Sequence, residues 1–194
     1  MNLVTIVSDS HRASEVFDNV QALFRGNDLG YETVDLNAIA VRVLSIVRAD
    51  LEEHRITAVT ELTSGLPHVM GHPGQMQEVL LNLVHNAIEA MNTIPDGRRV
   101  LHVRTEHHGS DAVAVIIEDS GPGIDPERLV GIFDPFVTTK PRGMGLGLAI
   151  CRMTIESHGG ELSASSLKDK GAVFRFTLPK AIREGADIAS AIAS

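Results

Sequence analysis

The pattern of apolar and polar residues over positions 74–91 predicts a helix that is apolar around most of its circumference. Five polar residues recur at steps of 4, 3, 1 and 3, which places them within an arc of roughly 100° on a helix. They are Glu78, Asn82, His85, Asn86 and Glu89, and the apolar remainder is Val79, Leu80, Leu83, Val84, Ala87, Ile88 and Met91. The helix is therefore expected to be mostly buried, with a narrow strip of oxygen and nitrogen ligands on one side.

The same kind of pattern predicts the other elements. Apolar steps of three and four in residues 3–25 predict an amphipathic helix that ends at Gly26. A second helix is expected from an N-cap at Asp35 through Leu51, and a third over 148–157, closed by the left-handed cap that Gly159 and Gly160 favour. Strands are expected over 56–62, 67–70, 99–106, 112–118, 161–166 and 172–178, and the Gly-rich segment 119–147 is expected to be irregular.

These strands are joined by short turns and do not alternate regularly with helices. The pattern therefore indicates an α+β fold, with helices packed on one face of a mixed, mostly antiparallel sheet and one amphipathic helix in front. The expected division is a helical segment over 1–30, a main domain over 31–180 and a mobile tail over 181–194.

Composition narrows the function. Of 194 residues 43% are hydrophobic and only 4% aromatic, with no Trp, so the core must be aliphatic. A net charge of −8 argues against nucleic acid or an anionic membrane as a general partner, so any phosphate ligand must be held by local features. The single cysteine, Cys151, lies among apolar neighbours and is expected to be a buried structural thiol in a reducing compartment. No apolar run is long enough to span a bilayer and no signal peptide is visible, so the expected location is cytoplasmic.

Two stretches carry candidate chemistry. Asp119 follows a predicted strand directly and precedes Gly121 and Gly123, so it could present a carboxylate to an exocyclic amine such as that of adenine. The alternative is a tight turn that uses Gly and Pro only for shape. Further on, the two phenylalanines of Phe133–Phe136 are expected to anchor the base of a loop in the core, or simply to pack there.

The second stretch is Gly143–Gly147, which opens a helix and follows two hydroxyls and two cations. Backbone N–H groups at such a helix start make an anion site, and cations beside it are informative in an acidic protein. A flexible linker with solvated cations is the alternative. Neither the Walker pattern nor the Rossmann G-x-G-x-x-G pattern is present.

In combination these stretches resemble a known family. Asn82-Leu-Val-His-Asn86-Ala resembles the N box of histidine kinases, Asp119–Gly123 the G1 box, Phe133–Phe136 the F box and Gly143–Gly147 the G2 box, in the family's order. The resemblance covers about residues 34–180. It implies a Bergerat-type α/β sandwich that binds ATP and Mg²⁺ between its helices and sheet, under a lid over about 125–147.

The resemblance also implies roles for individual residues. Asn86 would be the magnesium ligand, Asn82 a phosphate or metal-shell contact, and Asp119 the acceptor for the adenine amine. His85 and Glu89 lie on the same face and are interpreted as residues that contact the ligating side chains or face solvent. The residues expected to bind the nucleotide are Asn86, Asp119, Gly121, Gly123, Phe133, Phe136, Thr139, Lys140, Gly143, Gly145, Gly147 and Leu148, with Asn82, Glu78 and Lys140 as the catalytic set. One departure is Ala172, where many relatives have Thr, which removes a hydroxyl contact.

The identity of residue 82 separates two reactions. In the gyrase-like ATPases of the superfamily a glutamate stands four residues before the metal-binding asparagine and activates water; here that position is Asn82, and an amide cannot act as a general base. Glu78, one turn earlier, is a weaker candidate. The sequence thus favours a protein histidine kinase that transfers the γ-phosphoryl group. A serine kinase of the same superfamily and a nucleotide-binding regulatory module remain alternatives, and a metal-dependent hydrolase using His85 and Glu89 is weaker.

Residues 9–25 resemble the second helix of the dimerisation and phosphoacceptor domain. His11 lacks the acidic residue and the downstream proline that accompany a phosphoacceptor histidine. The chain is therefore expected to bind nucleotide without autophosphorylating. Its expected partners are ATP, a phosphoacceptor-histidine helix and a response-regulator receiver domain, within a homodimeric full-length protein that could be membrane-anchored.

Overall fold

The computed structural model describes residues 30–94, 99–138, 143–166 and 171–181. Four predictions lie outside this part of the chain: the amphipathic helix before residue 30, the tail after residue 181, and the proposed phosphate contacts Thr139 and Lys140.

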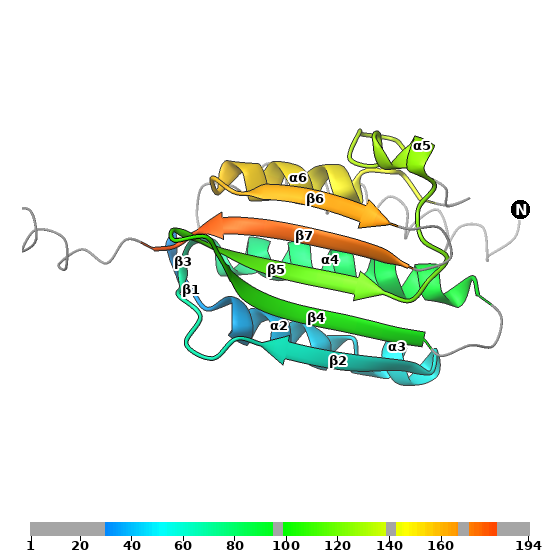
Figure 1. Ribbon diagram of the computed structural model, residues 1–194, viewed down its shortest axis with the longest axis horizontal. Helices are drawn as coiled ribbons and strands as arrows, with labels where there is room; N and C mark the ends of the chain where they lie inside the picture. The colour runs from blue at the N-terminus through cyan, green and yellow to red at the C-terminus, as the bar shows by residue number, and fades with distance from the viewer. Residues whose placement is uncertain (1–29, 95–98, 139–142, 167–170, 182–194) are drawn as a thin grey trace, which may run out of the picture.

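A five-stranded sheet in the order β2-β4-β5-β7-β6 forms the front layer of the molecule (Figure 1). The pairing of β2 with β4 is parallel and the other three pairings are antiparallel. The strands are β2 (Ile56–Leu62), β4 (Arg99–His108), β5 (Ala112–Asp119), β6 (Glu161–Ser166) and β7 (Ala172–Pro179). This confirms the predicted mixed, mostly antiparallel sheet.

Helices cover one face of this sheet, behind it in Figure 1. They are α2 (Leu36–Ile46), α3 (Arg48–Glu53), α4 (Pro73–Asn92) and α6 (Gly147–Ser157), while the short α5 (Pro126–Leu129) lies beyond one end. Helix α4 packs between α2 and α6 and against β5. Its eight buried side chains fill the centre of the core, and each stabilises the fold by roughly 1.5–3 kcal/mol if it is a large aliphatic residue.

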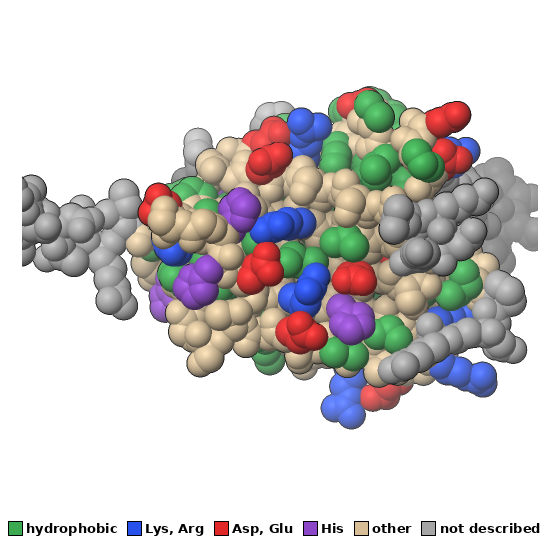
Figure 2. Space-filling model, viewed as in Figure 1, with side chains coloured by type: hydrophobic (Ala, Val, Ile, Leu, Met, Phe, Trp, Pro, Cys, Tyr) green, Lys and Arg blue, Asp and Glu red, His purple; other side chains and the backbone are tan. Residues whose placement is uncertain are grey.

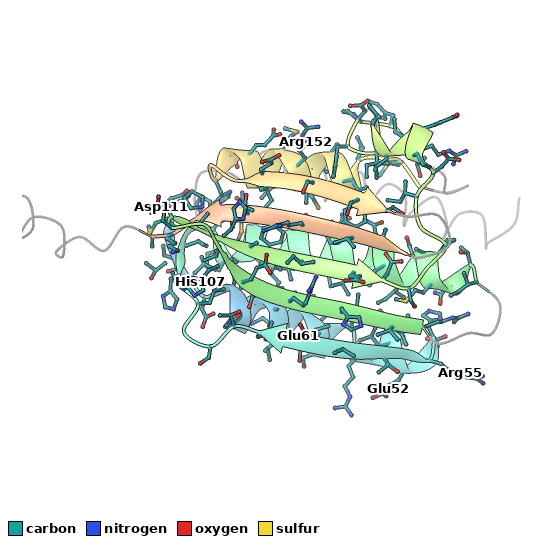
Figure 3. The ribbon with its side chains drawn as sticks, in the orientation of Figure 1. Glu52, Arg55, Glu61, His107, Asp111 and Arg152 are labelled. Atoms are coloured by element: carbon teal, nitrogen blue, oxygen red, sulfur yellow. The ribbon has the colours of Figure 1, made fainter. Side chains whose placement is uncertain are left out.

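The opposite face of the sheet is open and polar. Figure 2 shows acidic, basic and histidine side chains spread over it. The Arg104 Nη2 lies 3.7 Å from the Glu118 Oε2, and the Arg175 Nη2 lies 3.0 Å from the Glu106 Oε1. Because all four side chains are partly exposed, these ion pairs contribute little to stability. Glu61 on β2 and Arg152 on α6 lie on opposite long sides of the molecule, as Figure 3 shows.

Most predicted boundaries are confirmed within a few residues, and the differences are local. The helix predicted from Asp35 to Leu51 divides at Val47 into α2 and α3, although Val47 stays fully buried and its N–H still donates to the Val43 carbonyl. The N-cap at Asp35 is confirmed, because its Oδ1 accepts from the N–H groups of Asn37 and Ala38. The left-handed cap is confirmed by a φ of 73° at Gly159.

Two elements, one strand and one helix, were not predicted from the sequence. The strand β3 (Val69–Gly71), predicted slightly earlier, pairs with β1 (Glu32–Val34) in a separate two-stranded sheet, and β1 was not predicted. Three residues are too few for a periodic signal to emerge. The four-residue helix α5 was missed in the Gly-rich segment for the same reason.

A ring cluster at the β1–β3 end joins the helices. Tyr31 stacks on His158 with ring centroids 5.5 Å apart, and His72 lies edge-on to both rings. His158 is buried; its Nε2 accepts from the His72 N–H, and its Nδ1 lies 2.7 Å from the Thr154 carbonyl oxygen. The cluster therefore fixes the end of α6 to the start of α4.

Candidate functional site

The polar strip of α4 is partly buried in its middle. Asn82, His85 and Asn86 are half-buried, whereas Glu78 and Glu89 at its two ends are exposed. The Asn86 Nδ2 donates to the Asn82 Oδ1 at 2.9 Å, so the two amides form a pair one turn apart. The predicted strip thus exists, and its inner part consists of amide and imidazole groups.

This amide pair meets the beginning of α6. A Cβ placed at Gly147 would lie 2.7 Å from the Asn82 Nδ2 and 2.9 Å from its Oδ1, so a side chain there would force the Asn82 amide to shift. The residue before Gly147 gives no side-chain cap to α6, and the first turn contains no acidic residue. The first N–H groups of α6 are therefore donors suited to an anionic ligand beside the amide pair.

Asp119 ends β5 and is the second focus of the site. Only 3% of the residue is exposed, and its Oδ1 accepts from the N–H groups of Gly121 at 2.8 Å and Ala172 at 3.4 Å. Burial raises the pKa of the Asp119 carboxyl, the two backbone hydrogen bonds oppose this, and the charge of Glu118 adds to the rise. Among the described residues no hydrogen bond to Oδ2 is found, so this oxygen is the acceptor that a ligand amine could use.

Glycines let the backbone close around Asp119. A Cβ at Gly121 would lie 2.7 Å from the Asp119 Oδ1 and 3.3 Å from the Ala90 side chain on α4. A Cβ at Gly171 would overlap the Asp119 carbonyl group. Gly171 also has a φ of 87°, a conformation that other residues rarely adopt. Main chain therefore packs closely against both the carboxylate and the main-chain carbonyl group of Asp119.

Serine hydroxyls, which were not among the predicted site residues, hold the segments around Asp119. The Ser120 Oγ accepts from the Val100 N–H at 2.8 Å. The Ser166 Oγ accepts from the Ile124 N–H at 2.6 Å and donates to the Gly171 carbonyl oxygen at 2.8 Å. The only signal in the sequence was a serine at the end of a predicted strand, which is too common to be informative.

The two phenylalanines of the segment after α5 have different positions. Phe133 is partly buried against the core, and the Arg152 guanidinium lies 5.7 Å from its ring centre. Phe136 is 76% exposed, so the expectation that both rings anchor in the core is wrong for Phe136. Its backbone has a φ of 69°, and its N–H donates to the Gly145 carbonyl oxygen at 2.9 Å.

The remaining predicted residues lie along the same end of the fold. Gly123 has a φ of 77° and Gly145 a φ of 67°, and both are half-buried. Gly143 is half-buried, and Leu148 packs partly against the core at the beginning of α6. The Asp119 end of β5 and the start of α6 face the end of the molecule where α5 lies, opposite the β4–β5 turn that His107 and Asp111 mark in Figure 3.

The donor set limits what metal the site could hold. Within the described segments no group of three or more His, Cys, Asp or Glu side chains is placed to bind a metal ion. The Asn86 amide oxygen is a hard ligand, and one protein oxygen suits a cation such as Mg²⁺, which keeps waters and takes further oxygens from substrate phosphates. The Asn86 oxygen thus fits a Mg²⁺ ion that takes its other ligands from water and phosphate.

Comparison with known proteins agrees with this geometry. A family described as histidine kinase-, DNA gyrase B-, and HSP90-like ATPase matches residues 71–182, more than half of the chain. The sensor histidine kinase ZraS of Salmonella typhimurium is 35% identical over 180 residues, which cover 92% of this chain and 38% of ZraS. The chain thus spans well under half the length of this curated relative.

Solved structures of similar fold include a nucleotide-free catalytic domain of the histidine kinase ThkA. It has 33% identity and a TM-score of 0.69, with 78% of this chain and 97% of that domain covered. A structure of ThkA in complex with the response regulator protein TrrA matches with 28% identity and a TM-score of 0.70, over 89% of this chain and 49% of that one. These matches confirm the resemblance drawn from the four sequence boxes.

In the described segments no helix is long and apolar enough to cross a membrane.

Proposed function

Because the chain belongs to the histidine kinase-, DNA gyrase B- and HSP90-like ATPase family, we propose that it is the catalytic ATP-binding part of a sensor histidine kinase. It would donate the γ-phosphoryl group of Mg-ATP to a histidine on a phosphoacceptor helix, for relay to an aspartate of a response regulator. The observation that carries the proposal is the buried Asp119 carboxylate, with one oxygen held by two backbone N–H groups, at the same end of the fold as the amide pair and the start of α6.

Asp119 is proposed to recognise the adenine. Its Oδ1 is fixed by Gly121 and Ala172, which would leave Oδ2 to accept a hydrogen bond from the exocyclic amine. Gly121 and Gly123 would shape the wall beside the base, because a side chain at Gly121 would reach both the carboxylate and α4. A base without an exocyclic amine at this position would leave the buried Asp119 oxygen without a donor. The cost of that unpaired acceptor would discriminate strongly between adenine and such a base.

The triphosphate is proposed to lie between α4 and the start of α6. The backbone around Gly143, Gly145 and Gly147 would approach the phosphates, with Lys140 and Thr139 as further contacts. Asn86 would supply an amide oxygen to Mg²⁺, which neutralises phosphate charge when bound. The protein's contribution to transfer would then be positioning and charge stabilisation, without a covalent step on its own side chains.

Transfer is favoured over hydrolysis by the chemistry of α4. The position one turn before Asn86 holds Asn82, whose amide cannot take a proton from water. Glu78 is exposed and lies two turns before Asn86, so it is a candidate for orienting a nucleophile and not for activating water in the site. ZraS, the relative named above, is a sensor histidine kinase.

Partners and domain limits follow from the same proposal. Residues 1–30 would form the second helix of a dimerisation and phosphoacceptor domain, residues 31–180 the catalytic domain, and 181–194 a tail. The complex of ThkA with TrrA makes a receiver domain a reasonable partner for this chain. Because ATP and response regulators are cytoplasmic, the catalytic domain would work in the cytoplasm.

The test mixes the chain with γ-labelled ATP, Mg²⁺ and a separate dimerisation and phosphoacceptor domain of a ZraS-like kinase. We expect acid-labile label on the histidine of the added domain and none on the chain alone. A variant of the added domain without its histidine is the control. Acid-stable label on serine would indicate a serine kinase, and nucleotide binding without transfer would indicate a regulatory module.

A further inference from the structure

The amide pair on α4 has a defined direction. Asn86 donates through Nδ2 to the Asn82 Oδ1 at 2.9 Å. This bond uses the NH₂ side of the Asn86 amide. It therefore turns the Asn86 Oδ1, the oxygen that could reach a cation, away from Asn82.

The second side of Asn82 is occupied by α6. The Cα of Gly147 packs so closely on the Asn82 amide that an added Cβ would lie 2.7 Å from Nδ2, 2.9 Å from Oδ1 and 3.2 Å from Cγ. All three atoms belong to one short side chain on a buried helix, which has few rotamers with which to move aside. Asn82 is thus confined between Asn86 and the first residue of α6.

We propose that Asn82 is a positioning residue. It holds the Asn86 oxygen toward the nucleotide-bound cation. It also sets the distance between α4 and the start of α6, and therefore the distance between the metal ligand Asn86 and the phosphate-facing N–H groups of α6. It acts through Asn86 and Gly147, and not through its own contact with phosphate or metal, which is the role predicted from the sequence. This inference rests on the proposed function, because it assumes that Mg²⁺ and a nucleotide bind here.

The chemistry of position 82 fits this role. The residue must accept a hydrogen bond from Asn86 and must be flat enough to lie against Gly147, and a planar amide satisfies both conditions. An aliphatic side chain would remove the acceptor that the Asn86 Nδ2 uses here, and with it one constraint on the direction of that amide. Gly147 is in turn required by Asn82, because the space that a Cβ needs is taken by the amide.

A first experiment measures how much Mg²⁺ strengthens binding of a non-hydrolysable ATP analogue, from dissociation constants with Mg²⁺ and with EDTA. The variants are Asn82→Ala, Asn86→Ala and the double variant, with Gln77→Ala as a control that removes another half-buried amide from α4. We expect each single change in the pair to reduce the Mg²⁺ effect about fivefold or more, and the double variant to lie within about twofold of Asn86→Ala, since both act through one ligand. Gln77→Ala should keep the full effect.

A second experiment needs neither nucleotide nor metal. Gly147→Ala is made in the native protein and in the Asn82→Ala background, and the thermal unfolding midpoints are compared. We expect Gly147→Ala to lower the midpoint when Asn82 is present, and to leave it unchanged or raise it when Asn82 is replaced, because the alanine methyl then has room and suits a helix. This cycle reads the packing of Asn82 on Gly147 alone.

Each outcome decides the inference. Losses of the Mg²⁺ effect that multiply in the double variant would overturn it, because Asn82 would then contact the ligand independently of Asn86. Equal destabilisation by Gly147→Ala in both backgrounds would also overturn it. If the native protein binds no nucleotide, the proposed function fails, whereas the unfolding cycle still accepts or rejects the contact between Asn82 and Gly147.

Discussion

Folding and ligand binding favour different protonation states of the Asp119 carboxyl: burial favours the protonated acid, whereas a ligand amine needs an oxygen that accepts a hydrogen bond. Burial raises the pKa of the carboxyl, so the folded state favours its protonated form. Stability from this group is therefore fully present below the carboxyl's unfolded pKa and is lost as the pH rises through its folded value. Above its folded pKa the ionised carboxylate costs stability, and it is kept where an amine could use it.

Replacing Asp119 with Asn should separate the two demands. The Asn Oδ1 can still accept from Gly121 and Ala172, while its NH₂ group replaces the acceptor proposed for adenine. We expect ATP affinity to fall by roughly 10- to 100-fold, the loss of one buried hydrogen bond with an unpaired partner, and binding of inorganic triphosphate to change little. The unfolding midpoint should not fall at pH 7, and any gain should disappear in acid. Isothermal titration measures the two affinities, and thermal unfolding at pH 7 and at acid pH measures the midpoint.

Glu118→Gln is the matched control, since Glu118 precedes Asp119 but lies beside Arg104 on the open sheet face. It should leave ATP affinity unchanged. Equal losses for ATP and triphosphate in Asp119→Asn would contradict the adenine assignment.

The Cys151 thiol should be unreactive toward thiol reagents in the folded protein. Burial, followed by the charge of Glu78, raises the pKa of its thiol to about 12. Because the thiolate is the reactive form, labelling by a disulfide reagent at pH 8 should be at least about a hundredfold slower in native than in denatured protein. Rapid native labelling would show that α6 opens readily and would contradict the buried structural thiol that the sequence predicts.

Among elements, the segment between α5 and α6 depends on a contact that the sequence did not reveal. The Phe136 N–H donates to the Gly145 carbonyl oxygen, and both residues have positive φ. A Cβ at Gly145 would lie 2.6 Å from the Phe136 carbonyl carbon and 2.7 Å from the Val137 nitrogen. The glycine therefore closes the base of the segment.

Gly145→Ala should open this base. We expect ATP affinity to fall by about tenfold or more, because strain of about 1–3 kcal/mol must be relieved by moving the segment, with little change in the unfolding midpoint. Gly74→Ala is the control: Gly74 lies in the first turn of α4 with nothing within 4 Å of its Cβ position, and the change should stabilise by up to about 1 kcal/mol. Fluorescent-nucleotide titration and thermal unfolding measure both variants, and unchanged affinity in Gly145→Ala would refute the role.

Prediction of elements succeeded where side-chain periodicity was long. Helix α4 and the strands β2 and β6 have the expected limits within a residue or two, because 6 to 20 residues repeat one pattern. The break at Val47 was not predictable from the apolar periodicity of residues 36–51, because Val47 is buried whether the helix is continuous or divided. The pairing of β1 with β3 depends on two segments 35 positions or more apart that carry no pattern of their own.

For the whole molecule, one layer of helices on one sheet face has a consequence for stability. The proposed ligand site is built where β5, α4 and α6 converge, so a bound nucleotide would stabilise the layers against separation. At a concentration 100 times its dissociation constant, a Mg²⁺-bound ATP analogue should add about 2.7 kcal/mol. For a domain of this size that raises the unfolding midpoint by roughly 5–10 °C.

Removal of Mg²⁺ with EDTA should reduce this shift, and Asp119→Asn at the same analogue concentration should reduce it by about half or more, because a 10- to 100-fold weaker affinity leaves about 1.4 to 0.4 kcal/mol of the stabilisation. Differential scanning calorimetry measures the shift. A midpoint that does not change with the analogue would contradict nucleotide binding in this part of the fold.

By itself the sequence determined the fold class, the position of α4, the polar strip on it and the family, because periodicity and residue type are local properties. It also placed Asp119 and the glycine segments in order along the chain. Only the tertiary structure decided how they meet: that Asp119 gives one oxygen to Gly121 and Ala172, that Phe136 is exposed while Phe133 is partly buried, and that Asn82 lies between Asn86 and Gly147. These contacts join residues up to 65 positions apart, and their distances follow from the packing of α6 and β7 onto α4 and β5, which no local pattern contains.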